Sequence, residues 1–265
     1  MPSTVDAALV SRLRVAGCVF AEEEAALLVE AATSTAELDR LVDLRVSGLP
    51  LEYVLGWVEF AGRRFAISPG VFVPRRRTEL LARCAASVLP QKNQKNPLTV
   101  VDLCCGCAAI GATIASGLAG VRVYAADIDP VAVRCARRNL AAVGGQAFEG
   151  DLYAALPRSL RGRADLIVAN APYVPTENIA LMPSEARDHE PRSALDGGSD
   201  GLDVLRRVVL EAPPWLSPDG TVLVEVSERQ APHLVAIAES IGRTGEFITD
   251  EEIGGSALLI RNRRR

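Results

Sequence analysis

The chain has 265 residues, of which 49% are hydrophobic and 23% charged, and its formal net charge is −4 at pH 7. These values are typical of a globular protein, and they exclude an intrinsically disordered chain, a collagen-like repeat and a coiled coil. No apolar run reaches the roughly 18–20 residues of a membrane span, and charges interrupt the N-terminal segment, so we expect a cytoplasmic protein with no secretory signal and no membrane partner.

Net charge and cysteine spacing bear on whether the protein binds nucleic acid or a metal ion. The negative net charge argues against a dedicated nucleic-acid-binding protein, although arginine clusters at 75–77 and 263–265 leave that question open. The six cysteines lack the two spaced pairs of a zinc site, and the two histidines stand apart in the sequence. We therefore predict no metal site, and reduced cysteines buried in the core.

Residues 1–48 predict a small N-terminal helical domain. Apolar residues recur every three to four positions over 5–16, 22–32 and 34–45, which indicates three amphipathic helices. Ser34 and Glu37 form the capping-box pattern that opens the third of these helices. Gly48 and Pro50 follow it and predict its end.

Residues 49–76 predict a β-hairpin linker to the main domain, which we place at 77–265. The runs WVEF and RRFAI flank Ala61-Gly62, which is a hairpin signal, and an extended run follows at 71–74. A helix is expected over 78–89, and the polar segment 91–97 is expected to form an exposed loop.

From residue 98 onward, strand and helix patterns alternate. Strands are expected at 98–103, 121–127, near 147, and at 165–170, 221–226, 245–249 and 257–261. Helices are expected at 108–118, 130–143, 201–212 and 229–241. This alternation predicts an α/β fold with a doubly wound, mostly parallel sheet that binds ligands at the carboxyl ends of its strands.

The first βαβ unit carries the pattern of a nucleoside-binding site. Its first strand runs into a turn of small residues around Gly106, and its second strand ends in Asp127, where a carboxylate can accept hydrogen bonds from both ribose hydroxyls. The turn lacks the three glycines of a dinucleotide fingerprint, and no phosphate loop is present, which favours S-adenosylmethionine over NAD. Asp151 follows the third strand, where it can bind an adenine amino group or serve as a helix cap.

The fourth strand ends in the tetrapeptide Asn170-Ala171-Pro172-Tyr173. The Asn170 side-chain oxygen and a following backbone carbonyl can accept hydrogen bonds from the two N–H groups of a planar amino group. An amide nitrogen is a poor nucleophile because its lone pair is delocalised into the carbonyl, so catalysis would depend on positioning and electrostatics. As a bare tetrapeptide the signal is weak, and its place after a strand strengthens it.

Long stretches of the chain resemble the HemK/PrmC family of protein glutamine methyltransferases, a branch of the class I S-adenosylmethionine-dependent methyltransferases. The resemblance runs from PLEYVLGWVEF through VVDLCCGCAAIG, VYAADIDPVAVRCARRNL and DLIVANAPYVP to EARDHEPRSALDGGSDGLD and LVEVSERQ. It implies the Rossmann-like class I fold with a seven-stranded sheet. It also implies methyl transfer to a glutamine side chain on an exposed loop of a peptide chain release factor.

The resemblance also implies roles for individual residues. Asn170, Ala171, Pro172 and Tyr173 would form the catalytic motif that grips the glutamine amide. The residues implied in cofactor binding are Arg75, Thr78, Asp102, Cys104, Gly106, Asp127, Ile128, Asp151, Leu152 and Asn170. Those implied in substrate binding are Asn170, Pro172, Tyr173, Glu185 and Glu190, and no metal is implied.

Four departures from the family pattern stand out. Two of the three glycines in the family's D-L-G-x-G-x-G are replaced here by Cys104 and Ala108, whose Cβ atoms are expected to crowd the cofactor turn. Ala171 replaces a proline, a milder change because a backbone carbonyl remains. Arg76 and Arg77 replace a proline and an acidic residue. The helical domain is also shorter than in the family, where it contacts the release factor.

Two other functions remain open from the sequence. A nucleic-acid methyltransferase acting on an adenine or guanine amino group shares the Asn-x-Pro-Tyr element, although the net charge makes nucleic acid the less favoured partner. A degenerate family member with a crowded cofactor turn would act as a binding module without catalysis. We expect a monomer that acts on a protein substrate.

Overall fold

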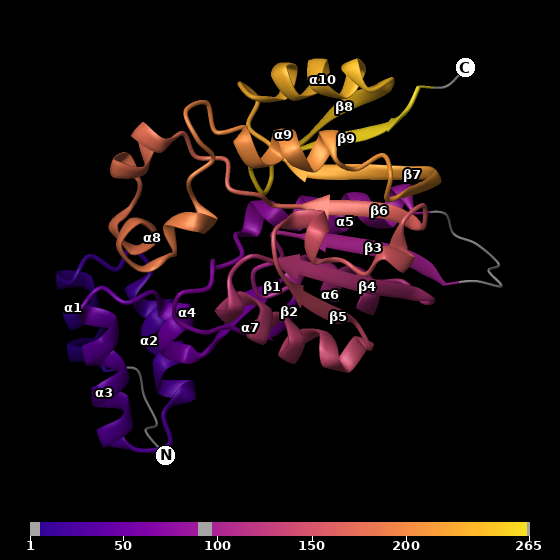
Figure 1. Cartoon of the computed structure of the whole chain (residues 1–265). Coiled ribbons are helices and arrows are strands. Elements are labelled where there is room, and N and C mark those ends of the chain that lie inside the picture. Colours follow the sequence, from indigo (N-terminus) through magenta and orange to yellow (C-terminus); the bar gives the residue numbers. More distant parts are fainter. Residues whose placement is uncertain (1–5, 90–96, 264–265) are drawn as a thin grey trace.

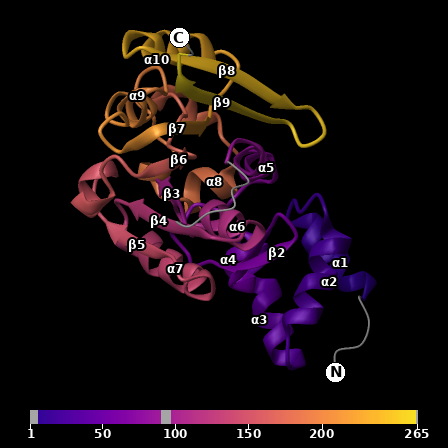
Figure 2. The same ribbon diagram turned by 90° about the vertical axis from the view of Figure 1, so that its right-hand side faces the viewer.

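The computed structural model describes residues 6–89 and 97–263. Its N-terminal part contains α1 (Ala7–Val15), α2 (Ala21–Ala31) and α3 (Thr35–Val46), which confirms the three predicted helices. These helices, called the helical unit below, pack around their own core, in which Leu13 and Leu28 are fully buried. Figures 1 and 2 show the helical unit beside the sheet, with the hairpin between them.

Helix α3 begins with the predicted capping box. The Ser34 hydroxyl accepts a hydrogen bond from the Glu37 amide at 3.2 Å, and the Glu37 carboxylate accepts one from the Thr33 amide at 2.8 Å. A short helix that the sequence did not predict, α4 (Leu51–Leu55), follows and ends at Gly56, whose φ is +75°. Five residues are too few for a helical period to emerge from the pattern.

The hairpin forms as predicted. Its strands β1 (Trp57–Phe60) and β2 (Arg63–Ala66) pair antiparallel. The run at 71–74 is not paired as a strand, and a 3₁₀ turn, η1 (Arg76–Thr78), precedes α5 (Glu79–Val88). The predicted exposed loop at 91–97 lies outside the described residues except for its last position.

One sheet of seven strands forms the centre of the molecule. The strands are β3 (Leu98–Leu103), β4 (Val121–Asp127), β5 (Gln146–Glu149), β6 (Ala164–Ala169), β7 (Leu216–Glu225), β8 (Arg243–Asp250) and β9 (Gly255–Asn262). Their order is β5-β4-β3-β6-β7-β9-β8, and β9 runs in the direction opposite to the other six strands. The winding direction reverses between β3 and β6, and ligands of doubly wound sheets bind at the carboxyl ends of strands at such a point. The predicted fold class is confirmed.

Helices cover both faces of this sheet. On one face lie α5, α6 (Ala109–Gly117) and α7 (Pro130–Leu140), and on the other α9 (Asp203–Leu210) and α10 (Ala231–Ser240). Val100 and Val101, neighbours on β3, are both fully buried and belong to different cores, because successive side chains of a strand point to opposite faces. None of the described helices combines the length and apolarity that crossing a bilayer requires.

The long segment between β6 and α9 forms short helices that the sequence patterns did not predict. It contains η5 (Thr176–Leu181), α8 (Ser184–His189) and η6 (Arg192–Ala194). Figure 1 shows this segment, in orange, leaving the sheet and lying above the helical unit.

Candidate functional site

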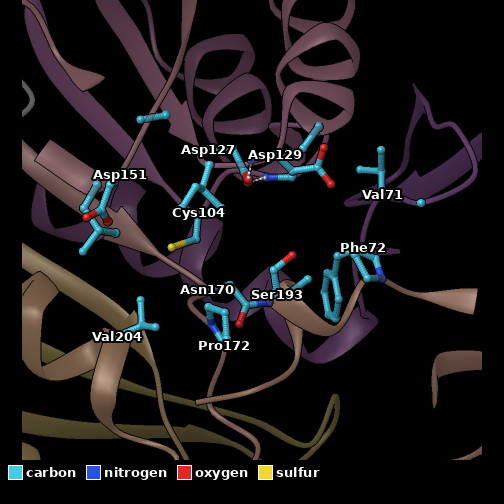
Figure 3. A pocket seen from close by; sticks show the side chains of 18 of the residues that line it. Val71, Phe72, Cys104, Asp127, Asp129, Asp151, Asn170, Pro172, Ser193 and Val204 are labelled. Carbon is cyan, nitrogen blue, oxygen red and sulfur yellow. Dashed lines mark hydrogen bonds between the residues drawn. The ribbon is translucent and has the colours of Figure 1, made fainter. Parts of the chain in front are cut away.

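A pocket opens at the carboxyl ends of the central strands, where the winding reverses (Figure 3). We call it the main pocket. It is lined by Gly70, Val71, Phe72, Cys104, Gly106, Ala126, Asp127, Ile128, Asp129, Ala132, Asp151, Leu152, Asn170, Pro172, Pro191, Ser193, Ala194, Val204 and Arg207. A smaller side pocket shares Phe72, Cys104, Gly106 and Asn170 with it and continues to Thr78. Asn170 therefore stands where the two spaces meet.

The turn after β3 has a left-handed backbone at three positions, two of which carry side chains. The φ angles of Cys104, Gly106 and Ala108 are +52°, +54° and +59°, all in the left-handed region. Such a conformation costs roughly 1–3 kcal/mol for a residue other than glycine. The expected crowding is realised only in part, because Cys104 lines both pockets whereas Ala108 is fully buried and lines neither. Burial raises the pKa of the Cys104 thiol, which therefore stays protonated.

Asp127 ties this turn to the next helix. One of its carboxylate oxygens accepts a hydrogen bond from the Gly106 amide at 2.8 Å, and the other accepts one from the Asp129 amide at 2.9 Å. Because each carboxylate oxygen can accept a second bond, Asp127 keeps acceptor capacity toward the main pocket, which it lines. Burial raises its pKa, while these amide bonds lower it. Ile128, beside it, is 61% exposed and also lines the pocket.

At the far end of the main pocket, Asp151 is held by a residue that the sequence analysis missed. Its two oxygens accept hydrogen bonds from both terminal nitrogens of Arg207, at 2.9 and 3.0 Å. Arg207 belongs to α9, and no local motif marks it, because the contact depends on how α9 docks. Leu152 follows Asp151 with a φ of +44° and a buried side chain.

The predicted catalytic tetrapeptide begins at the junction of the two pockets. The Asn170 side-chain nitrogen donates a hydrogen bond of 3.4 Å to the hydroxyl of Thr78, whose side chain is buried. Ala171 is buried, and Pro172 lines the main pocket (Figure 3). Thr78 thus contacts Asn170 directly, and η1 carries it to the site.

Tyr173 lines neither pocket and joins the exposed Arg77 to the buried Glu225. Arg77 donates a hydrogen bond of 2.8 Å to the Tyr173 hydroxyl, which donates one of 3.0 Å to Glu225. Arg77 also pairs with Glu225 at 3.2 Å. Burial and the nearby Glu225 raise the pKa of Tyr173 to about 12. The sequence analysis missed Glu225, although its place at the end of a predicted strand was a usable signal.

Four other predicted site residues do not line either pocket. Asp102 is fully buried, accepts a hydrogen bond from the Gly111 amide at 2.9 Å, and has its pKa raised to about 8 by burial. Arg75 pairs with Glu190 at 2.7 Å, and Glu185 pairs with Arg45 of the helical unit. Their roles toward a ligand stay predictions.

The polar groups of the main pocket favour a ligand that donates hydrogen bonds or carries positive charge. Asp127, Asp129 and Asp151 line it, and among the residues that the structure describes, Arg207 is the one lining residue with a positive charge. Within the part of the chain that the structure describes, no three His, Cys, Asp or Glu side chains gather as a metal site would require.

Comparisons with known proteins identify the family to which the chain is similar. A family model described as "Methyltransferase small domain" matches residues 63–185. A release factor glutamine methyltransferase of Geobacter sulfurreducens is 37% identical over 216 residues, which cover 81% of this chain and 73% of that protein. A 4-amino-L-phenylalanine/4-methylamino-L-phenylalanine methyltransferase of Streptomyces pristinaespiralis is 35% identical over 202 residues, covering 75% of this chain and 68% of that protein.

A solved structure shares the fold. It is the 16S rRNA N2 G1207 methyltransferase of T. thermophilus in complex with AdoMet and guanosine, with a TM-score of 0.54 and 20% identity. The match covers 78% of this chain and 50% of that one.

Proposed function

The chain belongs to the release factor glutamine methyltransferase family, and from that premise we propose that it methylates the side-chain amide nitrogen of a glutamine in a peptide chain release factor, with S-adenosylmethionine as the methyl donor. The observation that carries the proposal is the place of Asn170, at the junction of the main and side pockets and after the fourth parallel strand.

The residues of the main pocket fit such a donor. Asp127 keeps acceptor capacity for the ribose hydroxyls, and Asp151, held by Arg207, can accept a bond from the adenine amino group. The turn at Gly106 would receive the methionine part, since a Cβ atom added there would meet nothing closer than 3.9 Å. When bound, the donor supplies an electrophilic methyl group on a positively charged sulfur, which suits a pocket lined by three carboxylates.

The chain's own contribution to the chemistry is positioning. Because the Asn170 nitrogen is directed to Thr78, its side-chain oxygen is free to accept one N–H of the acceptor amide, and the Ala171 carbonyl accepts the other. Holding both hydrogens fixes the plane of the amide and directs the nitrogen lone pair at the methyl group. Two oriented carbonyl oxygens also stabilise the positive charge that develops on that nitrogen in the transition state.

A second candidate acceptor is a small aromatic amine. It is favoured by the 35% identity to the methyltransferase named for 4-amino-L-phenylalanine, which shows that relatives of this chain are not all named for release factors. The same pair of acceptors at Asn170 and Ala171 would fit an aryl amino group.

A methyl-transfer assay separates these acceptors. Radiolabelled S-adenosylmethionine is incubated with the protein and, in parallel, with the release factors of the source organism, 4-amino-L-phenylalanine, or total RNA. We expect label in the release factor, and none in a release-factor variant whose acceptor glutamine is replaced by glutamate. Label in the aromatic amine or in RNA alone would assign the acceptor differently, and no binding of S-adenosylmethionine would indicate a non-catalytic binding module.

A further inference from the structure

Two ion pairs hold the ends of helix α8, which leads directly into the wall of the main pocket. Glu185, in its first turn, pairs with Arg45 of α3 at 2.6 Å. Glu190, the residue after the helix, pairs with Arg75 at 2.7 Å. The next residues to line the main pocket are Pro191, Ser193 and Ala194. Only a few residues of the chain therefore separate Glu185, which pairs with the helical unit, from the wall of the main pocket.

Arg45 is a fixed anchor for this contact. Its side chain is only 8% exposed and forms two hydrogen bonds with Glu24 of α2, at 2.6 and 3.2 Å. A third bond joins it to the carbonyl oxygen of Leu49 at 3.2 Å. A guanidinium whose planar fork is already bound on neighbouring elements has little freedom left, so the ion pair with Glu185 fixes α8 relative to the helical unit.

The other end of α8 connects two parts of the pocket lining. The Glu190 side chain is 1% exposed and accepts hydrogen bonds from Arg75 and, at 3.2 Å, from the Val73 amide. Arg75 lies over the ring of Phe72, 5.0 Å from its centre, and Phe72 lines the pocket. Figure 3 shows Phe72 and Ser193 across the cavity from Asp127 and Asp129. A shift of α8 would therefore move the wall that faces the proposed ribose site.

We propose that Arg45 is a positioning residue for the cleft, which acts through Glu185 to hold α8 and the pocket wall at 191–194 in place for the ligand. For the identity of the ligand, the proposal rests on the proposed function. Glu185 is 47% exposed, so its ion pair is screened in part by water and its effect is moderate. The helical unit thereby contributes to the cofactor site without touching the cofactor.

The test uses Glu185, because removing Arg45 would leave Glu24 buried without a partner and could unfold the helical unit. In the full chain, Glu185→Ala should weaken S-adenosylmethionine binding by about 3- to 10-fold, measured by calorimetry. Amide hydrogen exchange over residues 184–194 of the ligand-free protein should become faster. Glu185→Gln, which keeps a hydrogen-bond acceptor for Arg45, should restore part of both properties.

The matched control is Asp188→Ala, on the same helix, whose carboxylate pairs with its sequence neighbour Arg187 and, within residues 6–89 and 97–263, forms no ion pair with another element. It should leave affinity and exchange near wild type. Faster exchange with unchanged affinity, or lower affinity with unchanged exchange, would overturn the proposal, since the wall and the ligand would then be uncoupled. If the wild-type protein does not bind S-adenosylmethionine, the proposed function fails. In that case, amide hydrogen exchange over residues 190–194 is the deciding measurement. Faster exchange in the Glu185→Ala variant would support the positioning role of Arg45, and unchanged exchange would refute it.

Discussion

The two halves of the cleft are built by contacts of different range. On the proposed cofactor side, Asp127 accepts hydrogen bonds from amides that lie 2 and 21 residues away in the chain. On the proposed acceptor side, Asn170 and Tyr173 bind partners 92, 96 and 52 residues away. The proposed ribose site at Asp127 is thus specified within one βαβ unit, although Asp151 at the far end of the pocket depends on Arg207, 56 residues away. The acceptor side forms only when η1, β6 and β7 are assembled. Substitutions on the cofactor side should therefore lower the affinity for the donor, and substitutions on the acceptor side should lower the rate of methyl transfer.

The largest effect is expected at Asn170. Asn170→Ala should lower the rate constant of methyl transfer by about 100- to 1,000-fold, because the contact with the acceptor amide acts mainly in the transition state. The affinity for S-adenosylmethionine should stay near wild type. Rates at saturating donor, together with calorimetric affinities, test both parts. Asn178→Ala, at an exposed position of η5, is the control. A variant that retains more than about a third of the rate would show that Asn170 is structural.

Replacing Asp127 should instead affect donor binding. Asp127→Ala should weaken S-adenosylmethionine binding by about 10- to 100-fold, because hydrogen bonds to a charged acceptor contribute roughly 1.5–3 kcal/mol each and water recovers part of this. The variant also loses the bonds to the Gly106 and Asp129 amides, so the turn loosens. Asp219→Ala, at an exposed site, serves as control. Affinity within twofold of wild type would exclude Asp127 as the ribose ligand.

The same difference in range explains what the sequence could predict. The strands and long helices have clear periodic patterns, and Asp127 and Asn170 were found because each ends or follows a predicted strand. Helix α4 and the elements between β6 and α9 have at most six residues each, so no period marks them. Arg77, Arg207 and Arg45 gain their roles from partners on distant elements, which spacing along the chain cannot reveal.

The buried carboxyl of Asp102, at the end of β3, should make stability depend on pH. Its pKa, about 8 in the folded protein, exceeds the value near 3.9 of an unfolded chain. The stability contributed by the protonated carboxyl is therefore fully present below about pH 4 and is lost as the pH rises to about 8. Asp102→Asn cannot ionise, so its free energy of unfolding relative to wild type should improve between pH 5 and pH 8, by at most about 1.4 kcal/mol per pH unit. Denaturant titrations of ligand-free protein measure this, and a pH-independent difference would contradict it.

Tyr173 tests the acceptor side at a distance from the reacting atoms. Tyr173→Phe removes the hydroxyl that links Arg77 to Glu225 and leaves the ring in place. We expect a stability loss of about 1–2 kcal/mol and a moderate fall in the rate of methyl transfer, of roughly 3- to 10-fold, with unchanged donor affinity. Tyr124→Phe, on β4, is a control for the loss of a hydroxyl. A fall in donor affinity instead would mean that the two halves of the cleft are coupled through Tyr173.

The smallest effect is expected from restoring glycine to the turn after β3. Ala108 adopts a φ of +59°, and glycine there would relieve about 1 kcal/mol or more of backbone strain. Against this stand the loss of a buried methyl group, worth about 0.8 kcal/mol, and the greater freedom of glycine in the unfolded chain. These terms nearly cancel, so Ala108→Gly should change the free energy of unfolding by less than about 1 kcal/mol. Ala26→Gly, at an exposed position inside α2, has no strain to relieve and should lose about 1 kcal/mol.

Cys104 adds a side chain that lines both pockets, so its replacement tests the site as well as the backbone. The double change Cys104→Gly with Ala108→Gly should keep or improve the affinity for S-adenosylmethionine, because the left-handed turn is already formed and only the thiol leaves the pocket. Calorimetry with the donor and with its demethylated product measures this. An equal loss of affinity for both ligands would mean that the Cys104 side chain packs against the part they share. The two substitutions would then be adaptations of this turn rather than tolerated departures from glycine.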